Sequence, residues 1–98
     1  MNITISEKLA KALDKAAFAG TPWTERFALL VGGTITKFYW AHDDEFWDDL
    51  HIDVLDPSCG QRDSLIVASV EACEESQPYD YRQAPFVKLL GVEPESYL

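Results

Sequence analysis

The first seventeen residues place hydrophobic side chains at the spacing of an α-helix. Thr4 and Glu7 stand at capping-box spacing, and Ser6 competes with Thr4 as the N-cap residue. Gly20 supplies a stop signal. The pattern predicts a first helix between these signals. Its apolar face is formed by Leu9, Leu13, Ala16 and Ala17.

A second helix start signal follows directly at Thr21 and Pro22. Thr21 is a suitable N-cap, and Pro22 fits the first turn of a helix, where its missing N–H is tolerated. Gly32 and Gly33 then end the apolar stripe. The chain is therefore expected to begin with a helical pair. The stripe of this second helix comprises Trp23, Phe27, Leu30 and Val31.

From Thr34 the residues become β-branched and aromatic, which is typical of a strand. After a polar turn over residues 42–45, hydrophobic and polar residues alternate from 49 to 54. This pattern predicts a hairpin over residues 34–55. A helix over residues 44–55 is the alternative, because Phe46, Leu50 and Val54 are spaced four apart, but two β-branched residues in this run favour a strand.

The last third of the chain contains one apolar run of undecided type. Residues 64–72 form either a third strand or a helix capped by Asp63, because periodicity does not separate the two in so apolar a stretch. Residues 85–90, which begin with proline and end at Gly91, predict a short final helix. The expected fold is thus α+β in a single domain, residues 1–98: an N-terminal helical pair, a small antiparallel sheet and a short C-terminal helix.

Composition agrees with one folded domain. The chain has 98 residues, of which 47% are hydrophobic, enough for a core without disulfides or a metal. The two cysteines, Cys59 and Cys73, form no CxxC pair, and we expect both to be reduced. The N-terminus does not resemble a signal peptide, and no apolar run reaches the length of a membrane span. These features predict a cytoplasmic protein, working in its own cell or in a host cell.

Charge is strongly segregated along the sequence. Residues 1–42 carry five Lys or Arg against three Asp or Glu, whereas residues 43–98 carry three against fourteen, which gives the net charge of −9. Seven of those fourteen acids lie between positions 43 and 56, where the chain has no Lys or Arg. Such a run repels nucleic acid and anionic membranes and favours a basic protein surface. Direct nucleic-acid binding through this region is therefore not expected.

The acidic hairpin is the main candidate for a functional surface. Aromatic residues flank its acids on both sides, and carboxylates about 7 Å apart along a strand imitate the spacing of nucleic-acid phosphates. Aromatic and acidic side chains together suit a partner rich in Arg and Lys. Alternatively, the aromatics are sheet core and the acids only solvate its outer face. The predicted partner-binding residues are Asp43, Asp44, Glu45, Trp47, Asp48, Asp49, Asp53 and Asp56.

Other chemistry in the hairpin has weaker support. A metal site would draw on His42, His51, Asp44, Asp49 and Asp53, but the spacing matches neither an EF-hand nor a zinc pattern, so no metal or cofactor is predicted.

Covalent catalysis also lacks its usual signals. Pairing of Cys59 with His51 is disfavoured, because a reactive thiol needs an electropositive setting and this stretch is the most acidic in the chain. Three lysines on the first helix, Lys8, Lys11 and Lys15, are expected to be a solvated face.

In size, in its isoelectric point near 4.4 and in the acidic stretch from Asp43 to Asp56, the chain resembles the small acidic inhibitors that phages use against host defence, including anti-CRISPR proteins and DNA mimics. This resemblance implies a non-enzymatic protein that binds and blocks a basic, nucleic-acid-binding face of a partner complex. The alternative is an accessory or structural domain, such as a homodimer, whose acidity only provides solubility. A metal-dependent enzyme is a remote third.

Overall fold

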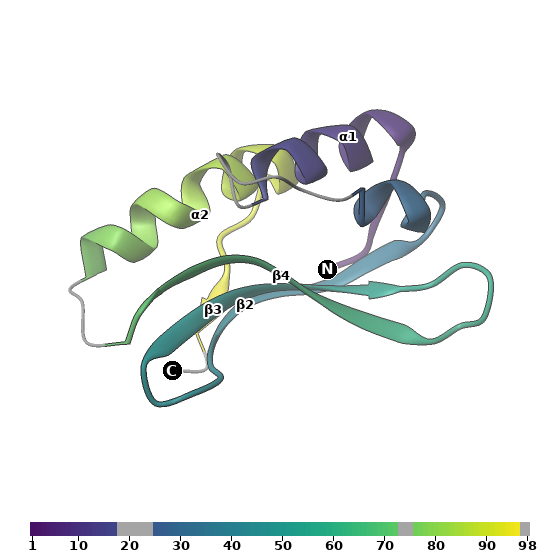
Figure 1. Ribbon diagram of the computed structural model, residues 1–98. Helices are drawn as coiled ribbons and strands as arrows, with labels where there is room; N and C mark the ends of the chain where they lie inside the picture. Colours follow the sequence, from purple (N-terminus) through teal and green to yellow (C-terminus); the bar gives the residue numbers. More distant parts are fainter. Residues whose placement is uncertain (18–24, 73–75, 97–98) are drawn as a thin grey trace.

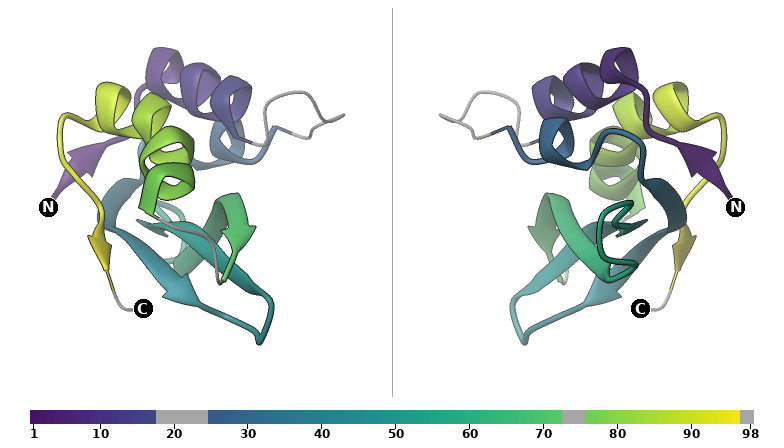
Figure 2. Two further views of the ribbon diagram at one scale, coloured as in Figure 1. Left: turned by 90° about the vertical axis from the view of Figure 1, so that its left-hand side faces the viewer. Right: turned by 90° about the vertical axis from the view of Figure 1, so that its right-hand side faces the viewer.

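The computed structural model describes residues 1–17, 25–72 and 76–96. In this part of the chain, two α-helices lie over one face of a five-stranded sheet (Figures 1 and 2). In chain order the elements are β1 (Ile3–Thr4), α1 (Glu7–Ala16), the 3₁₀ helix η1 (Phe27–Leu30), β2 (Thr34–His42), β3 (Trp47–Leu55), β4 (Arg62–Glu71), α2 (Ser76–Leu90) and β5 (Glu95–Ser96).

The predicted arrangement of helices is wrong. The chain does not begin with a helical pair: a short strand comes first, then α1, then the strands, and the second α-helix follows the sheet. The predicted cap of a second helix at Thr21 and Pro22, and Trp23 of its stripe, lie outside the described residues. Of the described part, only the single turn Phe27–Leu30 is helical. Apolar spacing alone could not separate such a turn from the start of a longer helix.

Asp14 explains why that single turn is stable. Its buried carboxylate, on α1, accepts hydrogen bonds from the backbone N–H groups of Arg26 (3.1 Å), Phe27 (2.8 Å) and Ala28 (3.0 Å). These donors lie at the start of η1 and would otherwise have no partner within the helix. A side chain from α1 therefore caps η1 and joins the two segments.

The sheet is built around β2. The strands β2, β3 and β4 pair antiparallel in sequence order. Because β3 occupies one edge of β2 along its length, β1 and β5 share the other edge: β1 pairs antiparallel at Thr34–Ile35 and β5 pairs parallel at Tyr39–Trp40. The sheet is therefore larger than the predicted one, and it is not purely antiparallel.

The predicted hairpin is confirmed, and the segment of undecided type is also a strand. Residues 47–55 belong to β3 and pair with β2 as a hairpin, so the alternative helix over residues 44–55 is wrong. Residues 62–71 form β4. A bulge at Thr36 shifts the alternation of β2, so that Ile35, Phe38 and Trp40 all face the core.

The final helix is longer than predicted. α2 begins at Ser76, and Pro85 lies inside it, where it cannot donate a hydrogen bond to the carbonyl of Tyr81. Phe86 is buried, and the Trp40 indole donates from β2 to Gln83 of α2 (2.9 Å). Proline is commonest in the first turn of a helix, and this preference placed the predicted start too late.

The strand alternation gives the sheet two different faces. In β3, Leu50, Ile52 and Val54 point into the core beneath the helices. By the same alternation Asp49, His51 and Asp53 point to the face that the helices do not cover. No helix in the described part of the chain is long and apolar enough to span a membrane.

Candidate functional site

The turn between β2 and β3 is held by one of the predicted acids. The carboxylate of Asp44 accepts hydrogen bonds from the backbone N–H groups of Phe46 (2.7 Å) and Trp47 (2.8 Å). Directly after β4, the N–H of Ala72 donates to the carbonyl of Phe46 (2.8 Å). These hydrogen bonds fix the backbone conformation of the turn that carries the two aromatic side chains.

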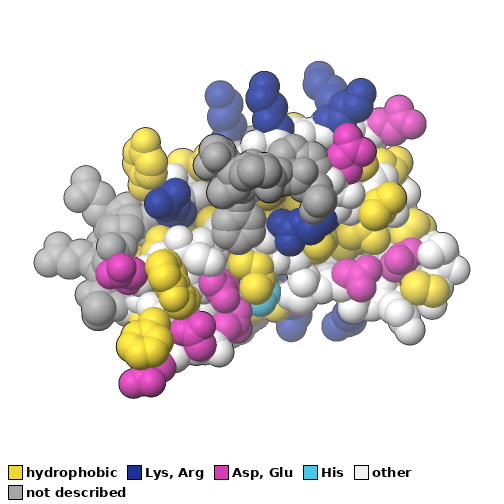
Figure 3. Space-filling view, in the orientation of Figure 1, with side chains coloured by type: hydrophobic (Ala, Val, Ile, Leu, Met, Phe, Trp, Pro, Cys, Tyr) yellow, Lys and Arg dark blue, Asp and Glu magenta, His cyan; other side chains and the backbone are white. Residues whose placement is uncertain are grey.

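Both aromatic side chains of this turn are exposed. Phe46 is 69% exposed and Trp47 is 45% exposed, and together they line an open cleft of about 490 Å³ with Glu45, Glu71 and Ala72. At the lower left of Figure 3, hydrophobic and acidic side chains adjoin at this end of the hairpin. We refer to this surface as the acidic aromatic tip. It consists of Asp43, Asp44, Glu45, Phe46, Trp47 and Glu71, all of which are exposed.

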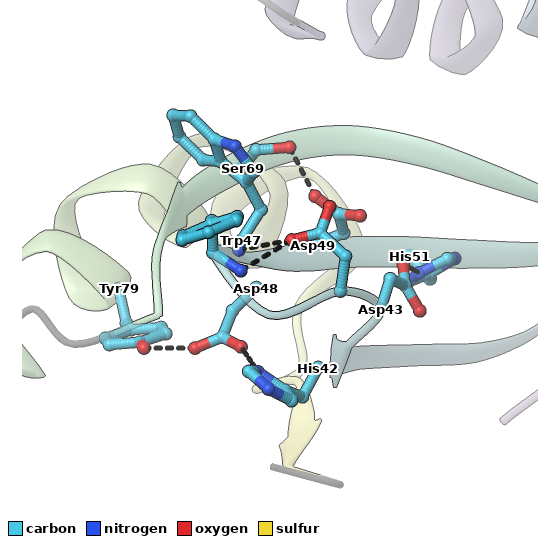
Figure 4. A network of polar contacts seen from close by, with 10 residues as sticks. His42, Asp43, Trp47, Asp48, Asp49, His51, Ser69 and Tyr79 are labelled. Carbon is cyan, nitrogen blue, oxygen red and sulfur yellow. Dashed lines mark hydrogen bonds and ion pairs between the residues drawn. The ribbon is translucent and has the colours of Figure 1, made fainter.

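Two of the predicted docking acids are buried beneath the tip. Asp48 is 3% exposed, and its carboxylate binds the imidazole Nδ1 of His42 (2.6 Å) and accepts the hydroxyl of Tyr79 from α2 (Figure 4). Asp49 is 8% exposed and accepts from the Ser69 hydroxyl (2.5 Å). Neither carboxylate is available to a large partner.

The remaining two predicted acids lie further along the hairpin. The half-buried Asp53 accepts the Tyr39 hydroxyl (3.0 Å). Asp56, in the loop after β3, accepts both the backbone N–H (2.8 Å) and the hydroxyl (2.7 Å) of Ser58. The eight predicted residues therefore do not form one surface, and only Asp43, Asp44, Glu45 and Trp47 meet at the tip.

Asp43 and Asp49 join a second group of polar residues around His51, on the face without helices. The imidazole Nε2 of His51 binds the Asp43 carboxylate (2.5 Å), and its Nδ1 contacts the Ser64 hydroxyl (2.8 Å). The Tyr39 ring stacks on the imidazole, with the ring centroids 5.0 Å apart and the planes 2° from parallel. Donor atoms of Asp43, Asp49 and His51 all lie within 4.8 Å of one another.

The pKa values of the two carboxyl groups in this cluster are shifted in opposite directions. Burial raises the pKa of Asp49; the Ser69 hydroxyl opposes this rise, and the neighbouring Asp43 adds to it. Burial alone would also raise the pKa of Asp43, but hydrogen bonds from Asp49 and His51 outweigh it and lower that pKa. The Asp43 carboxyl group is therefore the more acidic of the pair.

The other sequence-based candidates are separated by the fold. Of the five residues considered for a metal, only Asp49 and His51 come together, because His42 faces Asp48 on the core side. A Cys–His pair does not form, since both nitrogens of His51 are engaged by Asp43 and Ser64 while Cys59 is exposed in a loop. Cys73 lies outside the described residues.

The basic stripe and the acidic tip occupy different parts of the molecule. The three lysines of α1 are exposed, and Figure 3 shows basic side chains along the top of the molecule, over the helices. The hairpin tip projects from the opposite side of the sheet in the same orientation (Figure 1). The lysines of α1 and the acidic aromatic tip therefore occupy separate parts of the surface.

Several site residues could not be selected from the sequence. Phe46, expected only to flank the acids, is the most exposed aromatic of the tip. Glu71, Ser64 and Ser69 come from β4, and Tyr79 comes from α2. Their proximity depends on strand register and helix packing, for which the sequence carried no local signal. Comparisons with family models, with curated proteins and with solved structures found no match for this chain.

Proposed function

We propose that this protein is a non-enzymatic binding protein that docks its acidic aromatic tip onto a basic surface of a partner protein. The observation that carries this proposal is the exposure of Phe46 and Trp47, at 69% and 45%, side by side on a turn braced by Asp44. Large aromatic side chains contribute most of the affinity at many protein interfaces. A braced turn loses little conformational entropy when it binds.

Charge selects the kind of partner. Four exposed acidic residues, Asp43, Asp44, Glu45 and Glu71, belong to the tip together with the two aromatic residues. This rim complements a hydrophobic hollow edged by Arg and Lys, and it repels other acidic proteins. A basic face that ordinarily holds nucleic acid has this character, so the proposal extends to an inhibitor that competes with nucleic acid, as anti-CRISPR proteins do, in the cytoplasm of its own cell or a host.

Charge also disfavours self-association through this surface. A symmetric dimer formed by two tips would bring eight carboxylates together, which is unfavourable at a buried contact. Contact between the tip of one copy and the lysines of α1 on another would be head-to-tail, and such contacts produce open chains or rings. The accessory homodimer is therefore the less favoured function.

The test is capture of a partner by the immobilised protein from lysate of its source cell. We expect Trp47→Ala to lower the affinity for the partner by about 2 kcal/mol or more, roughly 30-fold, because Trp47 is at the centre of the proposed contact. Glu45→Lys combined with Glu71→Lys should abolish capture at low salt. Leu29→Ala is the matched control, since Leu29 is 84% exposed and belongs to η1.

Capture alone does not support the proposal. The captured protein must be basic, must be released by high salt, and must be displaced by a short DNA or RNA duplex if its nucleic-acid face is the docking site. Equal capture by Trp47→Ala and Leu29→Ala proteins would contradict docking through the tip. If salt releases the partner but nucleic acid does not displace it, the result supports docking onto a basic surface and contradicts competition with nucleic acid.

A further inference from the structure

We propose that Asp43, Asp49 and His51 form a binding site for a divalent transition-metal ion such as Zn²⁺ or Mn²⁺. This site goes beyond the proposed docking function and does not depend on a partner. Its three donor atoms, two carboxylate oxygens and one imidazole nitrogen, lie within 4.8 Å of one another. Ligands of one ion stand about 3–4 Å apart when each is about 2.1 Å from it, so small side-chain movements suffice.

The mixed donor set distinguishes this cluster from the surface acids elsewhere in the hairpin. Asp49 and His51 are both more than nine-tenths buried, and they come from alternate positions of β3, so they point to the same side of the sheet. Asp43 reaches over them from the turn. The site therefore combines two elements and is partly shielded from water.

Neighbouring groups orient the two buried ligands. Ser69 donates to the carboxylate of Asp49 (2.5 Å), and Ser64 contacts the Nδ1 nitrogen of His51 (2.8 Å). With an ion on Nε2, the proton of His51 would lie on Nδ1 and be donated to Ser64. Metal-binding histidines commonly have such a partner on the second ring nitrogen. The Tyr39 ring, stacked on the imidazole, fixes the plane of the third donor.

The closeness of the Asp43 and Asp49 carboxyl groups, beside one imidazole nitrogen, is the observation that points to a cation. Two carboxylates this close repel each other, and here they do so in a protein of net charge −9. A divalent ion bound between them would neutralise both carboxylates. Oxygen with imidazole nitrogen suits Zn²⁺ or Mn²⁺, whereas Ca²⁺ and Mg²⁺ prefer oxygen ligands alone.

Three protein ligands leave coordination positions for water or another ligand. Asp49 borders an open cleft of about 470 Å³, which is also lined by Arg26, Asp44, Trp47, Ile66 and Ser69. The unfilled positions would be reached from this side.

The experiment is titration of the untagged full chain with ZnCl₂ and MnCl₂ by calorimetry, with CaCl₂ and MgCl₂ as comparison ions. We expect saturable binding of one Zn²⁺ or Mn²⁺ per chain, reversible by EDTA and at least about tenfold tighter than binding of Ca²⁺. Asp43→Asn, on the exposed turn, should weaken binding at least about tenfold. Asp63→Asn removes the same charge from an exposed position of β4 and is the matched control.

Location is tested separately, because buried Asp49→Asn and His51→Gln proteins could fail to fold. In NMR spectra of the unaltered protein, a substoichiometric amount of Mn²⁺ should broaden the amide signals of residues 43, 49 and 51 before those of residues 56 and 63. The proposal is overturned if no saturable binding occurs, if Asp43→Asn and Asp63→Asn weaken it equally, or if broadening spreads evenly over the acidic residues. None of these readouts depends on docking through the tip.

Discussion

Asp48 and Asp49 are neighbours in the chain, but their side chains point to opposite faces of the sheet. Asp48 points toward α2 and binds Tyr79, whereas Asp49 points to the other face and binds Ser69. Both are buried. A run of acids in a sequence therefore overstates the charge that a partner meets, because alternate residues of a strand face opposite sides. Replacing these two residues would test stability rather than docking.

Asp56 is a residue whose ionisation should be visible in stability. The Ser58 hydroxyl and the Ser58 backbone N–H lower the pKa of Asp56. A lowered pKa means that the folded protein favours the ionised form, so the stabilisation is present above the pKa of unfolded Asp, about 4, and is lost as the pH falls through the folded-state pKa.

We therefore expect the difference in unfolding free energy between the unaltered protein and Asp56→Asn to shrink as the pH falls below about 4. Urea unfolding at several pH values measures that difference. An NMR titration of the Asp56 carboxyl gives the direct check, and a midpoint at or above that of an unstructured peptide would contradict the assignment.

At the scale of elements, the side chain of Asp14 links α1 to η1. Its carboxylate accepts three backbone N–H groups at the start of η1. Asp14→Ala removes the acceptor of those three N–H groups and leaves the volume of the side chain unfilled. Because buried donors without an acceptor are unfavourable, the substitution should lower the unfolding free energy by about 2–3 kcal/mol.

Urea denaturation monitored by circular dichroism tests this value. Lys15→Ala, at the exposed neighbouring position of α1, should change the unfolding free energy by less than about 0.5 kcal/mol. If both variants unfold at the same urea concentration, the hydrogen bonds of Asp14 to η1 do not stabilise the fold.

Elements with a strong local pattern were predictable, and those determined by distant contacts were not. The alternation of Leu50, Ile52 and Val54 predicted β3, and Ser6 was recognised as a possible N-cap, which it is. The two-residue strands β1 and β5 have no periodicity to detect; they exist because β2 offers them an edge. η1 likewise depends on Asp14, which is twelve residues or more from the N–H groups it binds.

The candidate site was predictable to the same limited degree. The acidic hairpin was selected by its charge, and Trp47 by its place beside the acids in the sequence. The pairing of Asp43 with His51 required the turn geometry, and the serines that contact Asp49 and His51 required the register of β4. Sequence periodicity reports which side a residue faces, but it does not report which residue lies opposite.

At the scale of the whole molecule, the separation of the lysine face from the acidic tip gives the protein a charge asymmetry that would orient it toward a basic partner. Rim charges act mainly on association, while buried aromatic contacts act mainly on dissociation. With a captured partner, Glu71→Lys should slow association several-fold and reduce its salt dependence. Trp47→Ala should instead accelerate dissociation, roughly 30-fold for a loss of about 2 kcal/mol.

Surface plasmon resonance at two or more salt concentrations separates these rates. Identical effects of the two substitutions on association, with no change in dissociation, would mean that Trp47 does not enter the contact. The Leu29→Ala protein again serves as the control for loss of an exposed apolar side chain.

The shared edge of β2 determines how such a measurement should be set up. Ile3 lies opposite Ile35, while Ser96 lies opposite Trp40, two residues before the end of the strand that leads into the tip. The two attachment points are thus roughly 16 Å apart along β2, at about 3.3 Å per residue. A sensor surface or fluorescent protein joined after Ser96 would stand beside the docking residues and obstruct them. The same label joined before Ile3 would leave them facing the solution.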